Sequence, residues 1–194
     1  MYQKLFKPVF DVVFAFLLLF LLLPFLILTG ILISFHFKKS PFFFQKRIGK
    51  EEEPFTIWKF RSLSDKRNSI NQFLPDGKRM SQFGNLLRRT GIDEIPQLIN
   101  IVKGDMSFVG PRPLLPEYLP LYLEETRKRH SVKPGITGLA QINGGNSLEW
   151  EKRFEYDLAY VKQCSFRMDL KILCKTIYYL RESKPRKSIG AYKS

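Results

Sequence analysis

The longest apolar stretch of the chain lies near its N-terminus. Residues 12–33 contain no charged side chain and consist mainly of Leu, Phe, Ile and Val. As a straight helix they reach about 33 Å, enough to cross a hydrocarbon core of about 30 Å. The pattern therefore predicts a membrane segment. We reject a cleaved signal peptide, because the apolar core is unusually long for one and no small-x-small cleavage site follows.

The topology of this segment depends on Pro24, which lies near its centre. A proline there removes a helix hydrogen bond and clashes with the preceding turn. Because basic residues prefer the cytoplasmic side, basic flanks on both sides suit a hairpin that enters and leaves the same face. A spanning helix with a proline kink is the alternative, and composition leaves both open. The flanking basic residues are Lys4 and Lys7 before the segment, and Lys38, Lys39, Lys46 and Arg47 after it.

Beyond residue 40 the pattern changes to short strands, loops and amphipathic helices. Strands are predicted at 42–45 and 55–60, joined by a charged turn at 50–53, and a polar loop at 64–81 follows. The segment 134–146 is too rich in glycine for a helix and indicates a strand flanked by loops. Helical spacing predicts helices around 83–87 and 95–102, and at 116–129, 147–163 and 168–182.

These elements predict a mainly α fold with a few short β-strands, of the α+β class. We expect residues 1–40 to form the membrane hairpin and residues 41–183 a compact cytoplasmic domain with amphipathic surface helices. Residues 184–194 read as a loose basic tail.

The charge of the chain narrows the ligands. It has 32 Lys and Arg against 18 Asp and Glu, a net charge of +14. Such a balance favours polyanions: nucleic acid, anionic lipid or phosphorylated small molecules. The two cysteines and two histidines lack metal-ligand spacing, which argues against a disulfide scaffold, a zinc site or a histidine triad. The chemistry must therefore come from carboxylates and basic groups.

The segment from Arg88 to Pro116 carries the strongest candidate chemistry. It places two adjacent carboxylates, Asp93 and Glu94, between a pair of arginines and a glycine-rich turn that ends in Arg112. A carboxylate attacks phosphorus only when nearby cations offset its charge and that of the substrate. Pro96 suits the first turn of a helix, whose positive end would favour the ionised carboxylates. The same residues also suit a simple helix cap.

Three motifs follow one another along the chain: Lys59-Phe60-Arg61-Ser62, DEIPQL at 93–98 and GDMSFVGPRP at 104–113. In this order they resemble the motifs of the bacterial sugar transferase family, with further matches at 133–138 and at Trp150, Asp157 and Tyr160. The members of this family are monotopic phosphoglycosyl transferases that begin membrane glycan assembly. The short chain is similar to the minimal members, among them those that transfer diacetylbacillosamine phosphate in protein glycosylation.

The resemblance implies a membrane topology. In the family the apolar segment is a helix-break-helix that dips into the cytoplasmic leaflet of the bacterial inner membrane and returns, which favours the hairpin broken at Pro24. Many members have a serine before this proline, whereas this chain has Leu23. A serine hydroxyl helps to satisfy the backbone groups freed at such a break, and this chain lacks it.

The resemblance also implies a two-step transfer of a sugar phosphate from a UDP-sugar to undecaprenyl phosphate. Asp93, which matches the family's nucleophile, attacks the sugar-bearing phosphorus, releases UMP and becomes a phosphosugar ester. The lipid phosphate then attacks that ester. Mg²⁺ reduces the repulsion between the anions, and Asp93 and Glu94 are its candidate ligands. Downstream glycosyltransferases are candidate partners.

Phosphate contacts are assigned to basic side chains of the matched motifs, because guanidinium and ammonium groups suit phosphate oxygens. We expect Asp157 to anchor one of these basic groups. The candidate phosphate contacts are Lys59, Arg61, Arg88 and Arg112.

Three further expectations concern polar and aromatic residues. Gln141 or Asn146 is expected to read a sugar or uracil edge. Asp105 fixes the turn after a helix, and Trp150 and Tyr160 serve packing. One departure matters, because the family often has Gly-Arg-Asn where this chain has Gly144-Gly145-Asn146. The arginine that could bind phosphate or select the nucleotide sugar is therefore missing.

Two other functions compete with this one. A non-enzymatic basic protein that binds anionic lipid or nucleic acid explains the charge but leaves the motif around Asp93 without a role. A different phosphate-processing enzyme, such as a lipid phosphatase, would use similar groups. We favour the transferase and expect no nucleic-acid partner, and transfer to a lipid separates the three.

Overall fold

The computed structural model describes residues 1–181, without the side chains of 179–181. The predicted basic tail, 184–194, lies outside the described residues. The helices are α1 (Lys7–Phe37), α2 (Asp76–Arg79), α3 (Gln82–Thr90), α4 (Gln97–Val102), α5 (Glu124–Arg127), α6 (Leu139–Ile142), α7 (Trp150–Gln163) and α8 (Phe166–Arg181). The strands are β1 (Phe42–Ile48), β2 (Pro54–Phe60), β3 (Ser107–Val109) and β4 (Gly135–Thr137). The predicted mainly helical fold with short strands is confirmed.

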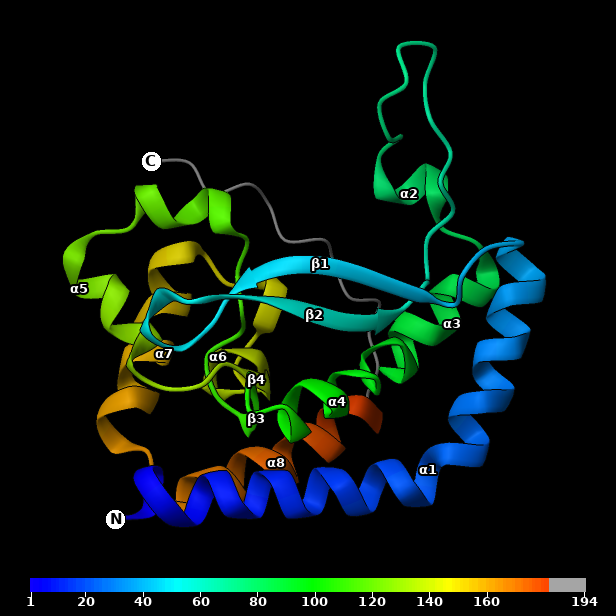
Figure 1. Ribbon diagram of the computed structural model, residues 1–194. Coiled ribbons are helices and arrows are strands. Elements are labelled where there is room, and N and C mark those ends of the chain that lie inside the picture. The colour runs from blue at the N-terminus through cyan, green and yellow to red at the C-terminus, as the bar shows by residue number, and fades with distance from the viewer. Residues whose placement is uncertain (182–194) are drawn as a thin grey trace.

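Two small sheets form the centre of the fold. β1 and β2 pair antiparallel, from Phe42 opposite Phe60 to Ile48 opposite Pro54, and β3 pairs parallel to β4. The charged turn between β1 and β2 closes with a bond from the Gly49 amide to the Glu53 carbonyl. In Figure 1 the β1–β2 hairpin crosses the middle of the molecule, with α4 beneath it. All three predicted strands are present, and β1 extends past its predicted end. The segment 134–146 contains the strand β4, but the expectation that it holds no helix is wrong, because α6 follows β4.

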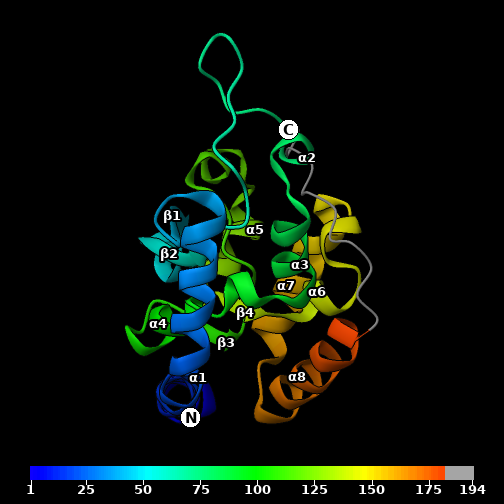
Figure 2. The same ribbon diagram turned by 90° about the vertical axis from the view of Figure 1, so that its right-hand side faces the viewer.

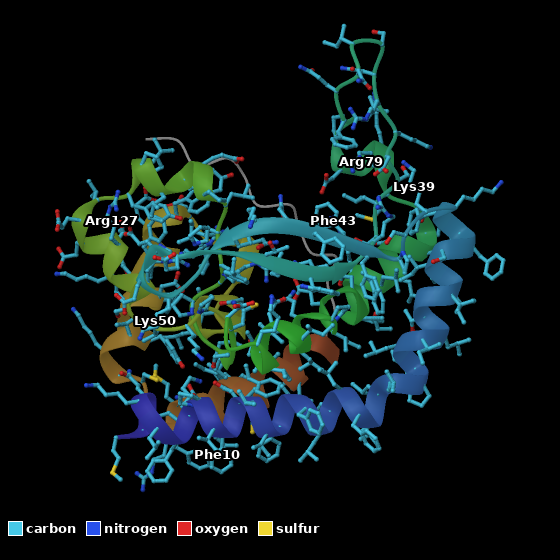
Figure 3. The ribbon with its side chains drawn as sticks, in the orientation of Figure 1. Phe10, Lys39, Phe43, Lys50, Arg79 and Arg127 are labelled. Carbon is cyan, nitrogen blue, oxygen red and sulfur yellow. The ribbon has the colours of Figure 1, made fainter. Side chains whose placement is uncertain are left out.

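The apolar N-terminal segment forms the single long helix α1, with Pro24 inside it. Figure 1 shows that α1 bends sharply about halfway along, so that its first half lies along the base of the molecule and its second half rises along one side. The expected interruption is thus a bend within a continuous helix. Large side chains on its outer side are exposed, including Phe20 (74%) and Leu21 (73%). Phe10 points away from the body in Figure 3. The helix is long and apolar enough to cross a membrane.

Both halves of α1 pack on the domain that carries the candidate site. Ala15, in the first half, is fully buried against Leu98 and Ile101 of α4. Ile33, in the second half, is fully buried against Phe60 of β2 and Leu87 of α3. The helix α1 therefore touches the elements on either side of the Asp93-Glu94 pair.

A buried amide joins α4 to β2. Asn100 is fully buried, and its side chain donates to the Thr56 carbonyl and accepts from the Trp58 amide. It also donates to the Asp105 carboxylate at 3.1 Å, next to the positive-φ residue Gly104. Asp105 therefore fixes the turn after α4, as predicted.

The helix predicted at 116–129 is wrong. The segment forms a 3-10 turn at Pro116–Leu121, the short α5 and a second 3-10 turn at Lys128–Ser131. Pro120 lies inside the first turn, where its missing amide hydrogen prevents a continuous α-helix. The polar loop predicted at 64–81 contains α2 and projects from the body (Figures 1 and 2).

Candidate active site

The two candidate catalytic carboxylates lie in a short turn between α3 and α4. Gly91 ends α3 in the left-handed conformation (φ 73°), and a 3-10 turn at Ile92–Glu94 follows. Pro96 is the N-cap of α4, so the pair precedes a helix as the sequence predicted. Asp93 and Glu94 are 6% and 7% exposed. Charged carboxylates buried to this degree require cationic or hydrogen-bonding partners.

Those partners include two of the predicted phosphate-binding residues. Glu94 Oε1 accepts from Lys59 Nζ at 3.0 Å and from an Arg112 guanidinium nitrogen at 2.9 Å. Lys59 comes from β2, and Arg112 follows β3. Burial lowers the pKa of Lys59 even though Glu94 and Asp93 oppose the shift. The charge of Glu94 raises the pKa of Arg112. The structure thus brings together residues from three separate motifs.

Arg47 is a basic residue of this region that the sequence analysis counted only as a flank of the membrane segment. Its guanidinium donates to the Pro113 carbonyl (3.3 Å) and to Gln45 Oε1 (2.6 Å). Burial and the charge of Arg112 lower its pKa to about 10. The β1–β2 register places Arg47 on the same face of the hairpin as Lys59. The predicted strand ends at residue 45, so neither the position of Arg47 on this face nor its proximity to Arg112 follows from the sequence.

Asp157 anchors Arg129, which is none of the basic groups expected for it. Both side chains are 1% exposed, and the Asp157 carboxylate accepts two bonds from the guanidinium, at 2.7 and 3.0 Å. Arg129 also donates to the backbone carbonyl of Arg112 at 2.8 Å. Burial raises the pKa of Asp157. The expected anchoring role of Asp157 is therefore present, but it acts on Arg129.

Arg61 and Arg88 have other carboxylate partners. The Arg61 guanidinium bonds to Asp65 at 3.0 Å and to the Ser40 carbonyl. Arg88 bonds to Ser62 at 3.0 Å and to Asp76 at 3.2 Å, both at the base of the projecting loop. Their predicted role as phosphate contacts stays a prediction.

Gln141, in α6, packs where two glycines meet. A Cβ added at Gly138 would lie 2.8 Å from Gln141 Oε1 and would clash with the Gly110 carbonyl. Both polar atoms of the Gln141 amide are buried without a hydrogen-bond partner among the described residues. Gly110 lies two residues before Arg112. This environment is compatible with the predicted contact to a polar ligand edge.

The turn at Gly145–Ser147, which also carries Asn146, contains no basic residue of its own. Arg153 of α7 reaches this turn and donates to the Gly145 and Leu148 carbonyls, both at 3.3 Å. Burial lowers the pKa of Arg153. A guanidinium is therefore present beside Gly145, although the chain lacks an arginine at that position.

The carboxylate pair suits one kind of metal site. No group of three or more His, Cys, Asp and Glu side chains gathers anywhere in residues 1–181. Mg²⁺ is commonly held by one or two carboxylates together with substrate phosphates. Asp93 and Glu94 meet that requirement, whereas a site made of protein ligands alone would need more of them.

Comparisons with known proteins agree with this chemistry. The family model described as bacterial sugar transferase matches residues 2–182. The uncharacterized sugar transferase EpsL of Bacillus subtilis is 49% identical over 171 residues, which cover 88% of this chain and 85% of EpsL.

Two longer relatives have more specific names. The UDP-glucose:undecaprenyl-phosphate glucose-1-phosphate transferase of Escherichia coli is 40% identical over 91% of this chain, and the match covers 40% of the transferase. The UDP-galactose-lipid carrier transferase of Erwinia amylovora is 33% identical over 90% of this chain, again covering 40% of the relative. The chain therefore spans about two fifths of the length of these two proteins.

Proposed function

This chain belongs to the bacterial sugar transferase family, whose members include phosphoglycosyl transferases, and we propose that it transfers a sugar 1-phosphate from a UDP-sugar to undecaprenyl phosphate. The observation that carries the proposal is the buried pair Asp93 and Glu94, in which Glu94 contacts both Lys59 and Arg112. Adjacent carboxylates held against two cations suit attack on a diphosphate, because the cations offset the charge that both reactants bring.

In the first step an Asp93 carboxylate oxygen attacks the phosphorus that bears the sugar. The bond between that phosphorus and the bridging oxygen breaks, and UMP leaves with the electron pair. The product is a phosphosugar ester of Asp93. In the second step an oxygen of undecaprenyl phosphate attacks the same phosphorus, and Asp93 leaves as a carboxylate. One UMP and one lipid diphosphate sugar are formed, so the atoms and charges balance.

The neighbouring residues orient this chemistry. Lys59 and Arg112 bind the phosphate oxygens, and their existing contacts with Glu94 hold them beside the nucleophile. Asp93 and Glu94 together would hold Mg²⁺, which would reduce repulsion between the carboxylate and the diphosphate.

The membrane supplies the lipid acceptor. We propose that the bent α1 is a re-entrant helix in the cytoplasmic leaflet of the bacterial inner membrane, which makes the protein monotopic. The exposed apolar side chains of α1 and the basic residues on both of its flanks support this arrangement. A cysteine placed at residue 4 or at residue 39 should resist reagents confined to the periplasm. Labelling of one end alone would indicate a spanning helix.

The sugar is proposed to be a hexose. Two of the relatives above are named for UDP-glucose and UDP-galactose, which supports a hexose more than the diacetylbacillosamine suggested by the resemblance to the minimal members. Arg153 beside Gly145 supplies a cation near the turn where many family members have an arginine.

The test supplies purified protein, Mg²⁺ and undecaprenyl phosphate with UDP-glucose, UDP-galactose and a UDP-diacetylbacillosamine control. We expect UMP and a lipid-linked sugar from at least one hexose donor. Absence of UMP with every donor would contradict the transferase. Release of inorganic phosphate from the lipid alone would indicate a phosphatase, and binding to anionic vesicles without any product a non-catalytic membrane protein.

A further inference from the structure

A buried polar cluster lies where the start of α1 meets α8, outside the site described above. Lys7 Nζ contacts the Asp169 carboxylate at 2.6 Å, and both residues are at least nine-tenths buried. The Tyr2 hydroxyl donates to the same oxygen of Asp169 at 2.7 Å. Figure 1 shows the first half of α1 and α8 together along the base of the molecule. The cluster therefore fixes the N-terminal end of the membrane helix to the domain.

The cluster continues into the domain through Tyr160 of α7. Its hydroxyl lies 2.7 Å from Asp169 Oδ1 and 3.0 Å from the Val109 carbonyl, and the residue is 1% exposed. The single proton of this hydroxyl lies between two acceptors, which share it as a three-centre hydrogen bond. Burial and the charge of Asp169 raise the pKa of Tyr160, so the hydroxyl keeps its proton. Tyr160 is thus more than the packing residue expected from the sequence.

The same strand has a second link to α1. Asp11, on the turn of α1 after Lys7, accepts from the Phe108 amide at 3.3 Å. Phe108 and Val109 are the last two residues of β3, and Arg112 follows three residues after Val109. Between them, Asp11 and Tyr160 hold the end of β3 from two elements. The position of β3 therefore depends on α1 being docked.

Two contacts from α7 therefore fix the backbone that carries Arg112. Asp157 and Tyr160 lie three residues apart on α7, so they share one face of that helix. Asp157 acts through Arg129 on the Arg112 carbonyl, and Tyr160 acts on the Val109 carbonyl. The stretch from 109 to 112 is fixed at its two ends by one helix face. Its geometry sets where the Arg112 guanidinium meets Glu94.

We propose that Tyr160, held by Asp169 and Lys7, is a positioning residue that couples the docking of the membrane helix to the placement of Arg112. This inference rests on the proposed transferase function. Burying Lys7 and Asp169 costs desolvation free energy that such a pair seldom recovers as stability. A role in placing β3 accounts for polar groups in a contact that apolar residues could have filled.

Two tyrosine variants test the coupling. Tyr160→Phe removes the hydroxyl from both Asp169 and Val109, whereas the matched control Tyr2→Phe removes a hydroxyl from Asp169 alone. We expect Tyr160→Phe to raise the KM for the UDP-sugar about tenfold, the loss of one well-placed hydrogen bond. Tyr2→Phe should change KM less than about twofold. Equal effects of the two variants would overturn the coupling.

A readout that does not use activity separates this inference from the proposed function. Amide hydrogen exchange of residues 107–112 should become faster in Tyr160→Phe and stay unchanged in Tyr2→Phe. If Tyr160→Phe does not fold, Asp169→Asn must give the same faster exchange, because it weakens the partner that holds Tyr160. Unchanged exchange in the folded variant overturns the inference. If the wild type releases no UMP but the two variants differ in exchange as expected, the proposed transferase function is contradicted and the coupling is not.

Discussion

Two buried clusters of arginine and carboxylate differ in how they meet solvent. In one, Glu94 contacts Lys59 and Arg112, whose side chains are 17% and 27% exposed. In the other, Arg129 and Asp157 are each 1% exposed and bonded to each other twice. The first cluster can exchange a contact for a phosphate oxygen, whereas the second cannot reach a ligand without unfolding. Similar residues thus suit ligand binding in one place and scaffolding in the other.

The comparison explains why burial alone is a poor guide to function. Both clusters hold charges out of water, and both contact Arg112. The cluster around Glu94 is distinguished by partial exposure and by two cations, Lys59 and Arg112, that share one carboxylate. What distinguishes the scaffold is a closed pair whose remaining bond goes to a backbone carbonyl.

The largest effect is expected from a substitution at Asp93, beside the partly exposed cluster of Glu94, Lys59 and Arg112. Asp93→Asn keeps the shape of the side chain but removes the nucleophilic charge, so product formation should fall by at least about 10³-fold. The melting temperature should stay close to that of the wild type. Asp105→Asn, a carboxylate of the neighbouring turn, is the matched control and should retain activity within about tenfold. UMP release measures both. Full activity of Asp93→Asn would eliminate Asp93 as the nucleophile.

A substitution in the fully buried pair of Arg129 and Asp157 should first lower the free energy of unfolding. Asp157→Asn leaves the Arg129 charge buried without its carboxylate, which should cost about 3–5 kcal/mol of unfolding free energy. The partly exposed carboxylate Asp65, paired with Lys39 and Arg61, is the control, and Asp65→Asn should cost less than about 1 kcal/mol. Denaturant unfolding in detergent compares the two. Equal destabilisation would remove the distinction between sealed and exposed pairs.

His130 lies next to Arg129 in the chain, and its protonation would add a positive charge to this buried region. Burial and the nearby Arg129 and Arg127 charges lower its pKa from 6.5 to about 4. The folded protein keeps His130 neutral between those values while the unfolded chain binds a proton, so stability falls as pH drops from 6.5 toward 4. The loss is at most about 3 kcal/mol. His130→Gln should show a smaller loss over that range, and an identical pH dependence would contradict a buried neutral histidine.

The smallest effect is expected at the base of the projecting loop. Arg88 pairs with Asp76, and the two side chains are 31% and 45% exposed. Arg88→Gln should change stability by less than about 1 kcal/mol. If Arg88 also binds phosphate, as the sequence predicts, the KM for the UDP-sugar should rise about tenfold while that for the lipid stays constant. An unchanged KM would show that Arg88 only pairs with Asp76 and does not bind phosphate.

Much of this architecture follows from local patterns in the sequence. The runs at 42–45 and 55–60 predict the two strands that form β1 and β2, and the apolar run at 12–33 predicts α1. The helix predicted at 116–129 is wrong, because its spacing is helical but Pro120 interrupts the hydrogen bonds. Local patterns therefore indicate elements well where the backbone chemistry agrees with them.

The site could be predicted only in part. The motifs identify Asp93, Glu94, Lys59 and Arg112, which the structure brings together. The pairing of Asp157 with Arg129 joins residues 28 positions apart and depends on how α7 packs. No local signal marks such a contact. The distinction between sealed and exposed charges is likewise a property of tertiary packing.

The most direct test of the account is a single-turnover experiment without the lipid acceptor. Purified protein is mixed with Mg²⁺ and an excess of an active UDP-hexose, and UMP and the intact protein mass are measured together. We predict about one UMP per chain and a hexose phosphate on the peptide that contains Asp93, both absent in Asp93→Asn. Addition of undecaprenyl phosphate should remove the adduct and form the lipid product. Activity with the lipid, but no UMP and no adduct without it, would contradict a covalent step at Asp93.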